Sequence, residues 1–404
     1  MSPRSETCFS LVASRQRGLT LVELMIALVI GSILMIGIIQ LFSGMRASYQ
    51  LNESLSRVQE SGRFAVELVS DELRVAGYAG PMGSLDRVCN FGHPGDGTDP
   101  EGNCPGGGSG GSGGGGGPGG GGGGGPGGSG NFSSIDVFTN QPVVGYEWTG
   151  DRDLGEDLTP EAVGSLGEWS GDIASDIRDP DLADLIEDRA IPGSDIFVVR
   201  SLGGGGSLSA TQPGGMGSNI DTPGNDFNEE EPIVIWDGSG TIFVGHRTNA
   251  AGNDTITFPG HFDGAGCCVP PISVARGQEI WFFVGRGADD QPALFYAQPR
   301  GDGGVESDEL VSGVEMMRMR FGVDETGNGS VDDYRDATQV ETDDQWEQVL
   351  AARLAFVVRS HTRLTDLPEV DELAVLGDVL DVVDNREYQR RVYSSTVRLR
   401  NRIP

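Results

Sequence analysis

The sequence contains no lysine, so its positive charge comes from arginine alone. Its 28 arginines stand against 60 acidic residues, and the formal charge of the 404-residue chain is −32. Because a phosphate backbone is bound by a basic surface, this charge argues against nucleic acid as a partner. The same charge favours solubility and self-repulsion, and it does not itself point to an activity.

Cysteine and histidine are also scarce. There are five cysteines and four histidines, namely Cys8, Cys89, Cys104, Cys267, Cys268, His93, His246, His261 and His361. They form no CxxC motif and no zinc-type spacing. A Ser–His–Asp set and a nucleotide loop between a strand and a helix are missing as well. We therefore predict a protein that is not an enzyme and has no cofactor.

One long apolar run lies near the start of the chain. From Leu24 to Met45 there are 22 residues without a charge, enough to cross a hydrocarbon core as a helix. No small-residue cleavage site follows the run, whereas Gly18 precedes it, next to Arg15 and Arg17. Arginines on this side favour a cytoplasmic N-terminus. We predict a retained membrane segment at about residues 22–45, with a plain signal anchor as the alternative.

Glu23 is the only charged residue at the start of this apolar segment. A carboxylate in lipid is costly and usually has a partner. Cleavage after Gly18 would create a new amine on Leu19. Glu23 of one subunit could then pair with that amine of a neighbour in a helical bundle, and the pairing would set the axial register.

The helical pattern continues beyond the apolar run. Leu51, Leu55 and Val58 recur at spacings of four and three, and no proline occurs between Leu19 and Gly80. Gly77 and Gly80 are suitable stop signals. The sequence predicts a helix over residues 19–76, roughly 87 Å long.

The remainder, residues 77–404, reads as a β-rich domain. Residues 105–130 are all Gly, Ser or Pro, which predicts a disordered insertion, or alternatively a linker between domains. The predicted strands are short apolar runs bounded by turn residues, at 135–139, 195–200, 233–236, 241–244, 255–258, 279–284 and 293–298. Residues 180–190 read as a short helix. The expected fold class is α+β.

The C-terminal third has the clearest alternation. Apolar residues over 317–323, 350–358 and 397–399 alternate with partners that include Arg318, Arg320, Arg353 and Arg398. This pattern predicts antiparallel strands with one water-exposed, arginine-bearing face. Such a basic stripe could bind a ligand, or it could pair with local acids.

Two parts of the chain resemble known families. The run Arg17-Gly18-Leu19-Thr20-Leu21-Val22-Glu23-Leu24 resembles the N-terminal signal of type IV prepilins and type II secretion pseudopilins, although Leu19 stands where phenylalanine is usual. The segments 71–78, 313–315, 319–324, 349–360 and 391–402 are similar to PilW, a minor pilin of type IV pilus assembly. The resemblance implies a pilin-like fold, in which the long helix packs on an antiparallel sheet domain with insertions.

The resemblance also implies processing, partners and location. A prepilin peptidase would remove residues 1–18 and the amine of Leu19 would be methylated. The partners would be other minor pilins, the major pilin and the inner-membrane assembly machinery. The subunit would sit in the inner membrane with a periplasmic domain and then in the filament, at its tip. Its role would be to prime or cap a type IV pilus, with adhesion or motility downstream. The alternatives are a type II secretion pseudopilin of the J type and a signal-anchored envelope binding protein.

Two smaller sites complete the expectations. Removal of Cys8 with the leader leaves four cysteines, an even count that suits an oxidising compartment. A Cys89–Cys104 disulfide would close a short loop, with crossed pairing to Cys267 and Cys268 as the alternative. Asp324, Asn328, Ser330 and Asp332, with Gly329 at the turn, resemble part of a calcium loop. An ordinary acidic turn is the other interpretation.

Overall fold

The computed structural model describes part of the chain. The described residues are 20–78, 88–90, 141–150, 153–155, 166–171, 173–177, 179–202, 208–211, 219–225, 227, 232–237, 242–246, 252–257, 270–287, 290–300, 304–364 and 370–402. They fall into two compact units, Met1–Glu53 and Ser54–Pro404. The predicted strand at 135–139 and the Gly-rich insertion at 105–130 lie outside the described residues.

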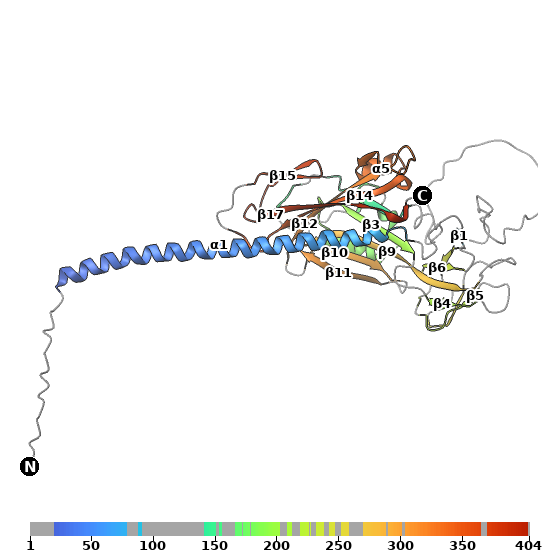
Figure 1. The fold of residues 1–404 in the computed structure, drawn as a ribbon, viewed down its shortest axis with the longest axis horizontal. Helices are drawn as coiled ribbons and strands as arrows, with labels where there is room; N and C mark the ends of the chain where they lie inside the picture. Colours follow the sequence, from blue (N-terminus) through green and yellow to red (C-terminus); the bar gives the residue numbers. More distant parts are fainter. Residues whose placement is uncertain are drawn as a thin grey trace, which may run out of the picture. The chain divides into compact units, whose positions relative to one another are not determined.

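One helix, α1 (Leu21–Val75), supplies the described structure of the first unit and continues into the second (Figure 1). It ends where the sequence predicts, because Gly77 adopts a φ of 70°, which favours glycine. The Gly77 amide then leaves the helical pattern and donates to the carbonyl oxygen of Arg200 at 2.9 Å. The helix terminus is thus tied to the β domain.

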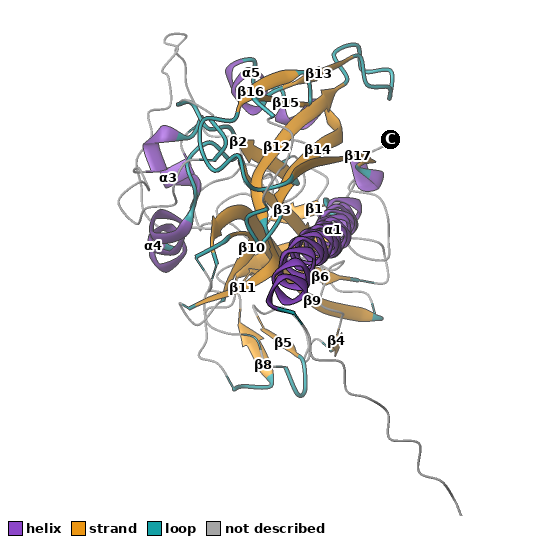
Figure 2. Ribbon diagram, turned by 90° about the vertical axis from the view of Figure 1, so that its left-hand side faces the viewer, coloured by secondary structure: helices purple, strands orange, loops and turns teal. Residues whose placement is uncertain are grey.

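The second unit contains a four-stranded and a nine-stranded sheet (Figures 1 and 2). The four-stranded sheet has the order β13-β12-β14-β17 and is antiparallel throughout. Its strands are β12 (Val314–Val323), β13 (Asp333–Arg335), β14 (Val349–Arg359) and β17 (Arg390–Arg398). Edge strand β17 carries the C-terminal alternation that the sequence shows.

The nine-stranded sheet is built around the 15-residue strand β9 (Ile272–Arg286). Its main path is β1-β7-β6-β9-β10-β11, and β2, β3 and β4 attach beside it. The bounds are β1 (Val88–Asn90), β2 (Val143–Tyr146), β3 (Ile196–Leu202), β4 (Leu208–Ala210), β6 (Pro232–Trp236), β7 (Ile242–His246), β10 (Pro292–Pro299) and β11 (Val305–Ser312). All its pairings are antiparallel except that of β1 with β7.

Smaller elements decorate these sheets. Two further sheets have two strands each: the hairpin of β15 (Glu372–Val375) with β16 (Asp378–Asp381), and the pair of β5 (Asn219–Asp221) with β8 (Thr255–Thr257). The helices are α3 (Ile173–Asp176), α4 (Pro180–Arg189) and α5 (Ala337–Thr342), with short 3-10 turns η2 (Leu166–Glu168), η3 (Trp346–Gln348) and η4 (Arg400–Arg402). Asp179 caps α4 and Asp336 caps α5 through side-chain oxygens that accept backbone N–H groups.

The main core joins the second part of α1 to both sheets. Val58, Ala65, Val69 and Leu73 form a buried stripe on the helix and pack with inward residues of the strands. A separate cluster on the other face of the four-stranded sheet includes Met316 and Val357, and the β15–β16 hairpin covers it. These contacts confirm the α+β class, with a long N-terminal helix and an antiparallel sheet domain.

One expectation about the four-stranded sheet is wrong. The face that carries Arg318 was expected to be exposed to water, but only 2% of the Arg318 side chain is exposed. Arg353 instead stacks over the Tyr334 ring, 3.9 Å from its centroid. The β15–β16 hairpin covers this face and excludes water from it. A charge buried there is costly unless it is paired, so Arg318 needs acidic partners close by. The alternative, pairing with local acids, is confirmed for Arg318 and Arg320.

Candidate functional site

The start of α1 holds the residue that the sequence marks for assembly. The Thr20 hydroxyl oxygen accepts the backbone N–H of Glu23 at 3.2 Å, and the Thr20 carbonyl oxygen accepts that of Leu24. Thr20 therefore caps the helix, and Glu23 lies in its first turn, where a negative charge is favoured. Within the described part of the chain the Glu23 carboxylate makes no hydrogen bond or ion pair, so it is available to a partner.

The first unit presents an apolar surface. All the large apolar side chains from Leu21 to Met45 are more than half exposed. An exposed apolar surface of this extent marks a membrane or protein contact. Among the described helices, α1 is the one long and apolar enough to cross a membrane. Together with the N-terminal motif reported below, this supports membrane anchoring near the N-terminus.

Within the second unit, α1 approaches β17 closely at Gly62. A Cβ atom built on Gly62 would lie 2.2 Å from a ring carbon of Tyr393, well inside any van der Waals contact. Glycine is therefore required sterically at this position. Complete burial of Val58, Val69 and Leu73 along the same stripe stabilises the docking by about 1.5–3 kcal/mol for each side chain.

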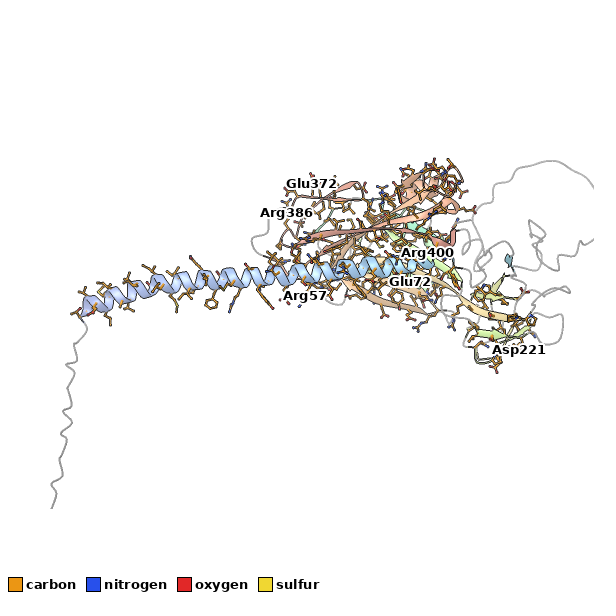
Figure 3. All side chains as sticks on the ribbon, in the orientation of Figure 1. Arg57, Glu72, Asp221, Glu372, Arg386 and Arg400 are labelled. Atoms are coloured by element: carbon orange, nitrogen blue, oxygen red, sulfur yellow. The ribbon has the colours of Figure 1, made fainter. Side chains whose placement is uncertain are left out.

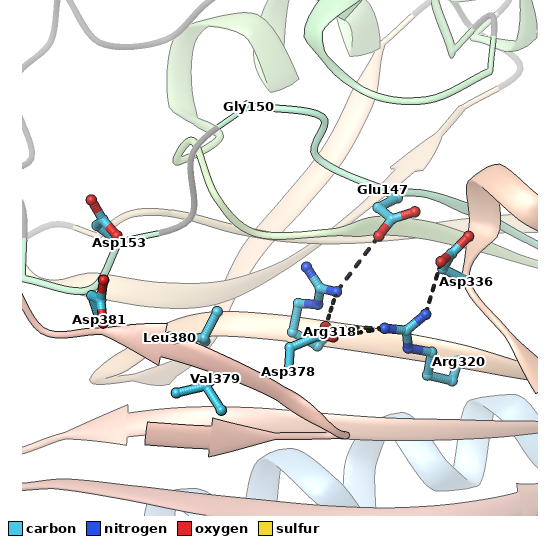
Figure 4. A pocket seen from close by; sticks show the side chains of 10 residues that line it. All are labelled: Glu147, Gly150, Asp153, Arg318, Arg320, Asp336, Asp378, Val379, Leu380 and Asp381. Atoms are coloured by element: carbon cyan, nitrogen blue, oxygen red, sulfur yellow. Dashed lines mark hydrogen bonds and ion pairs between the residues drawn. The ribbon is translucent and has the colours of Figure 1, made fainter. Parts of the chain in front are cut away.

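A buried charge cluster joins the four-stranded sheet to the β15–β16 hairpin (Figure 4). Arg318 Nη2 donates to Asp378 Oδ2 at 2.6 Å, and Arg320 Nη2 donates to Asp378 Oδ1 at 3.0 Å. Arg320 Nη1 also donates to Asp336 Oδ2 at 2.9 Å. Although burial lowers it, the pKa of Arg320 is raised overall by Asp378 and Asp336. One hairpin carboxylate thus holds two arginines of β12.

A cavity of about 450 Å³ opens beside this cluster. Its walls are Glu147, Gly150, Asp153, Arg318, Arg320, Asp336, Asp378, Val379, Leu380 and Asp381. Glu147 and Asp195 lie 3.6 Å from the Arg318 guanidinium. This cluster leaves no local pattern in the sequence, because 60 residues separate Arg318 from Asp378. The only signal was the placement of Arg318 and Arg320 on one strand face.

The candidate calcium loop follows β12, and its carboxylates are engaged with the backbone. The Asp324 carboxylate accepts N–H groups of Gly329 at 2.6 Å and Asn328 at 3.1 Å. Although desolvation raises it, these donors lower the pKa of Asp324 overall. Asp332 Oδ2 accepts the Thr326 amide at 3.1 Å, and the Ser330 amide donates to Asn328 Oδ1 at 2.8 Å.

In this geometry a cation would have to compete with backbone N–H groups for the carboxylate oxygens. The oxygens that would bind calcium already satisfy backbone donors, and Arg335, at the loop's twelfth position, donates to Glu325 and Asp343. Among the described residues, no group of three or more His, Cys, Asp or Glu side chains could hold a metal ion. Weak calcium binding by this loop stays a prediction.

Other predicted site residues are only partly placed. Cys89 lies in β1, where its backbone pairs with Phe243 of β7. Gly18, Leu19, Cys104, Cys267 and Cys268 fall outside the described residues. Cleavage, methylation of Leu19 and the disulfide pairing therefore remain predictions.

Comparison with known proteins returned two family matches. Residues 281–401 match the Type IV Pilus-assembly protein W family, which covers β10 through β17 and the end of β9. Residues 13–39 match the prokaryotic N-terminal methylation motif, which includes Glu23 and the first part of α1. No curated protein and no solved structure matches the chain. The matched regions contain the apolar helix start and the four-stranded sheet, and together they support a PilW-type protein of the type IV prepilin superfamily.

Proposed function

We propose that this protein is a minor pilin that primes or caps a type IV pilus filament. Its role is structural rather than catalytic, in keeping with the pilin families that it matches. The membrane-anchored precursor would have a cytoplasmic N-terminus and a periplasmic domain, and it would move into the filament after a prepilin peptidase cuts between Gly18 and Leu19. Other minor pilins, the major pilin and the inner-membrane assembly machinery are its partners.

One observation carries this proposal. Glu23 is a lone carboxylate that has no partner among the described residues, and it lies at the start of an exposed apolar helix. An unpaired carboxylate among apolar groups is unfavourable, so such a residue requires a charge from outside its own chain. The amine of Leu19 on a neighbouring processed subunit would supply that charge and fix the axial register of the two helices.

A secretion pseudopilin of the J type would share the same N-terminus. The match of residues 281–401 to a pilus-assembly family favours the pilus. Deleting this chain from its native host distinguishes the two proposed functions. Loss of filaments with normal secretion indicates the pilus, and loss of secretion with normal filaments indicates the pseudopilin.

Glu23→Ala should reduce filament number in cells that carry this variant alone. Removing a charged hydrogen-bond partner weakens each contact by about 1.5–3 kcal/mol, which is about a tenfold to hundredfold loss in an assembly equilibrium. Electron microscopy of surface filaments gives the number, and immunoblotting shows whether the subunit is still made.

Glu60→Ala is the matched control, because Glu60 is an exposed acid on the same helix in the second unit. It should leave filaments unchanged. Normal filament counts with Glu23→Ala would rule out the proposed pairing.

A further inference from the structure

The β15–β16 hairpin has an uncovered outer face. Its inward residues Val375, Leu380 and Val382 are buried against the sheet. Because side chains alternate along a strand, the residues that alternate with these inward ones point outward. We call these the hairpin face; it consists of Val370, Glu372, Ala374, Val379, Asp381 and Val383. Val379 is 63% exposed, Val370 45% and Val383 39%.

Like charges lie side by side on the hairpin face. Glu372 is directly opposite Asp381 in the ladder, an arrangement that destabilises a strand pair. The amide of Leu154 donates to the carbonyl oxygen of Asp381 at 2.8 Å, which brings Asp153 next to Asp381 (Figure 4).

These three carboxylates have no counter-charge in the described part of the subunit. Within the described residues none of Asp153, Glu372 and Asp381 has a hydrogen-bond or ionic partner through its side chain. Arg386, labelled with Glu372 in Figure 3, pairs with Asp371 at 2.7 Å instead and donates to the carbonyl oxygen of Val382.

The neighbouring cavity has the same charge imbalance. Asp153, Val379 and Asp381 line it, and its walls contain five carboxylates but two guanidinium groups. Both guanidinium groups are already engaged with Asp378, Asp336 and Glu147. In addition, Nη1 of Arg318 is buried and meets no hydrogen-bond acceptor among the residues that the structure describes. A buried donor of this kind is normally satisfied, so an acceptor entering from outside would stabilise the site.

We propose that the hairpin face docks a protein partner that presents an arginine or lysine between apolar side chains. The cation lies among Asp153, Glu372 and Asp381, and the apolar groups contact the valines. A carbonyl oxygen of the same partner segment can enter the cavity toward Arg318. The proposal goes beyond filament membership, because it concerns the globular unit and does not require membrane insertion.

Two other occupants fit less well. A second copy of this chain brings another charge of −32, and the two copies repel each other. A bare metal ion needs convergent ligands, and among the described residues no group of three or more acidic, His or Cys side chains has that arrangement. Charge complementarity therefore favours a basic protein surface.

Photocrosslinking in the native host tests this. The full-length chain carries p-benzoylphenylalanine in place of Val379, and mass spectrometry identifies the crosslinked peptide. We expect one partner protein whose crosslinked segment contains arginine or lysine. Asp153→Asn with Asp381→Asn should lower the yield by about tenfold or more, because the cation loses two of its three counter-charges.

The matched control is Asp184→Asn with Asp188→Asn, two exposed acids of α4, which should leave the yield unchanged. Thermal unfolding of the Asp153→Asn/Asp381→Asn variant should occur at the same or a higher temperature, since like-charge repulsion is removed. The proposal is overturned by an absent crosslink, a crosslink to a second copy, a crosslinked segment without basic residues, or a yield that the Asp153→Asn/Asp381→Asn variant leaves unchanged.

Discussion

At Gly62, α1 packs closely against Tyr393 of β17 in the second unit. The absent side chain lets the Tyr393 ring lie directly against the helix backbone. The Tyr393 hydroxyl is buried, and burial raises the pKa of Tyr393. A helix interior usually disfavours glycine by about 1 kcal/mol relative to alanine. Close packing is the reason for glycine here.

Gly62→Ala should therefore destabilise the protein, although alanine is the better helix former. Forcing a methyl group into a filled contact costs about 1–3 kcal/mol. Thermal unfolding of the full-length chain in detergent measures the change. Gly44→Ala is the control, because a Cβ at Gly44 meets nothing within 4 Å. Equal unfolding temperatures for Gly62→Ala and the wild type would contradict the observed contact.

The carboxylate of Asp324 is the group for which backbone donors and calcium would compete in the loop after β12. Its carboxylate accepts two backbone N–H groups, and calcium would compete with these donors for the same oxygens. If the loop binds calcium, the affinity should be low, at about 10⁻⁴–10⁻³ M, the range of extracellular modules.

Calorimetric titration of wild type, Asp324→Ala and Asp332→Ala with calcium chloride checks this prediction. A heat of binding that both variants abolish would establish the site. Equal heats in all three proteins, or none, would show that the loop is only a turn.

At the scale of elements, the β15–β16 hairpin is the structural cover of the four-stranded sheet. It turns at Leu376 and Gly377, which both have positive φ, and this geometry matches a tight hairpin. Asp378 follows the turn and pairs with Arg318 and Arg320, so the hairpin is held by charge as well as by apolar contacts. Removing one member of a buried ion-pair cluster leaves the others uncompensated.

Arg318→Met should destabilise the globular unit by about 3–5 kcal/mol, since Asp378, Glu147 and Asp195 lose a shared counter-charge. Denaturant unfolding measures the loss. Arg286→Met is the control, because the Arg286–Asp290 pair is largely exposed and such pairs contribute about 0–1 kcal/mol. Equal effects of the two substitutions would show that burial of Arg318 has no energetic consequence.

At the scale of the whole molecule, processing should change the mass and the charge together. The segment before Leu19 contains three arginines and one glutamate, so its removal changes the side-chain charge from −32 to −34. Intact-mass measurement of the protein purified from its native host should show a chain that begins at Leu19 and carries one added methyl group. A retained Met1, or a cut after the apolar run, would contradict the prepilin interpretation.

The two family matches leave the middle of the chain without a counterpart. Strands β2 to β8 precede residue 281, and β4 to β8 surround a separate small core that includes Ile220, Ile233 and Ile256. Neither family model extends over this region. The hairpin face, in contrast, lies inside the matched region, between residues 370 and 383.

The sequence by itself determined the N-terminal helix and most strand positions. Helical hydrogen bonds join residues four apart, and strand alternation has a period of two, so both leave a local pattern. The helix ends at Val75, just before the stop signal Gly77, and β12 and β14 lie where the alternation predicts them. The position of Glu23 is likewise visible without a structure, because its isolation among apolar residues is local.

Only the tertiary structure decided what covers each sheet face. The alternation of Arg318 and Arg320 with apolar residues is the same whether water or a hairpin lies above it. The cover comes from β15 and β16, some 60 residues later, and strand order and the parallel β1–β7 pair are equally long-range. The opposition of Glu372 and Asp381 is set by the hairpin register. Such contacts depend on chain segments that meet after folding, and no local period records them.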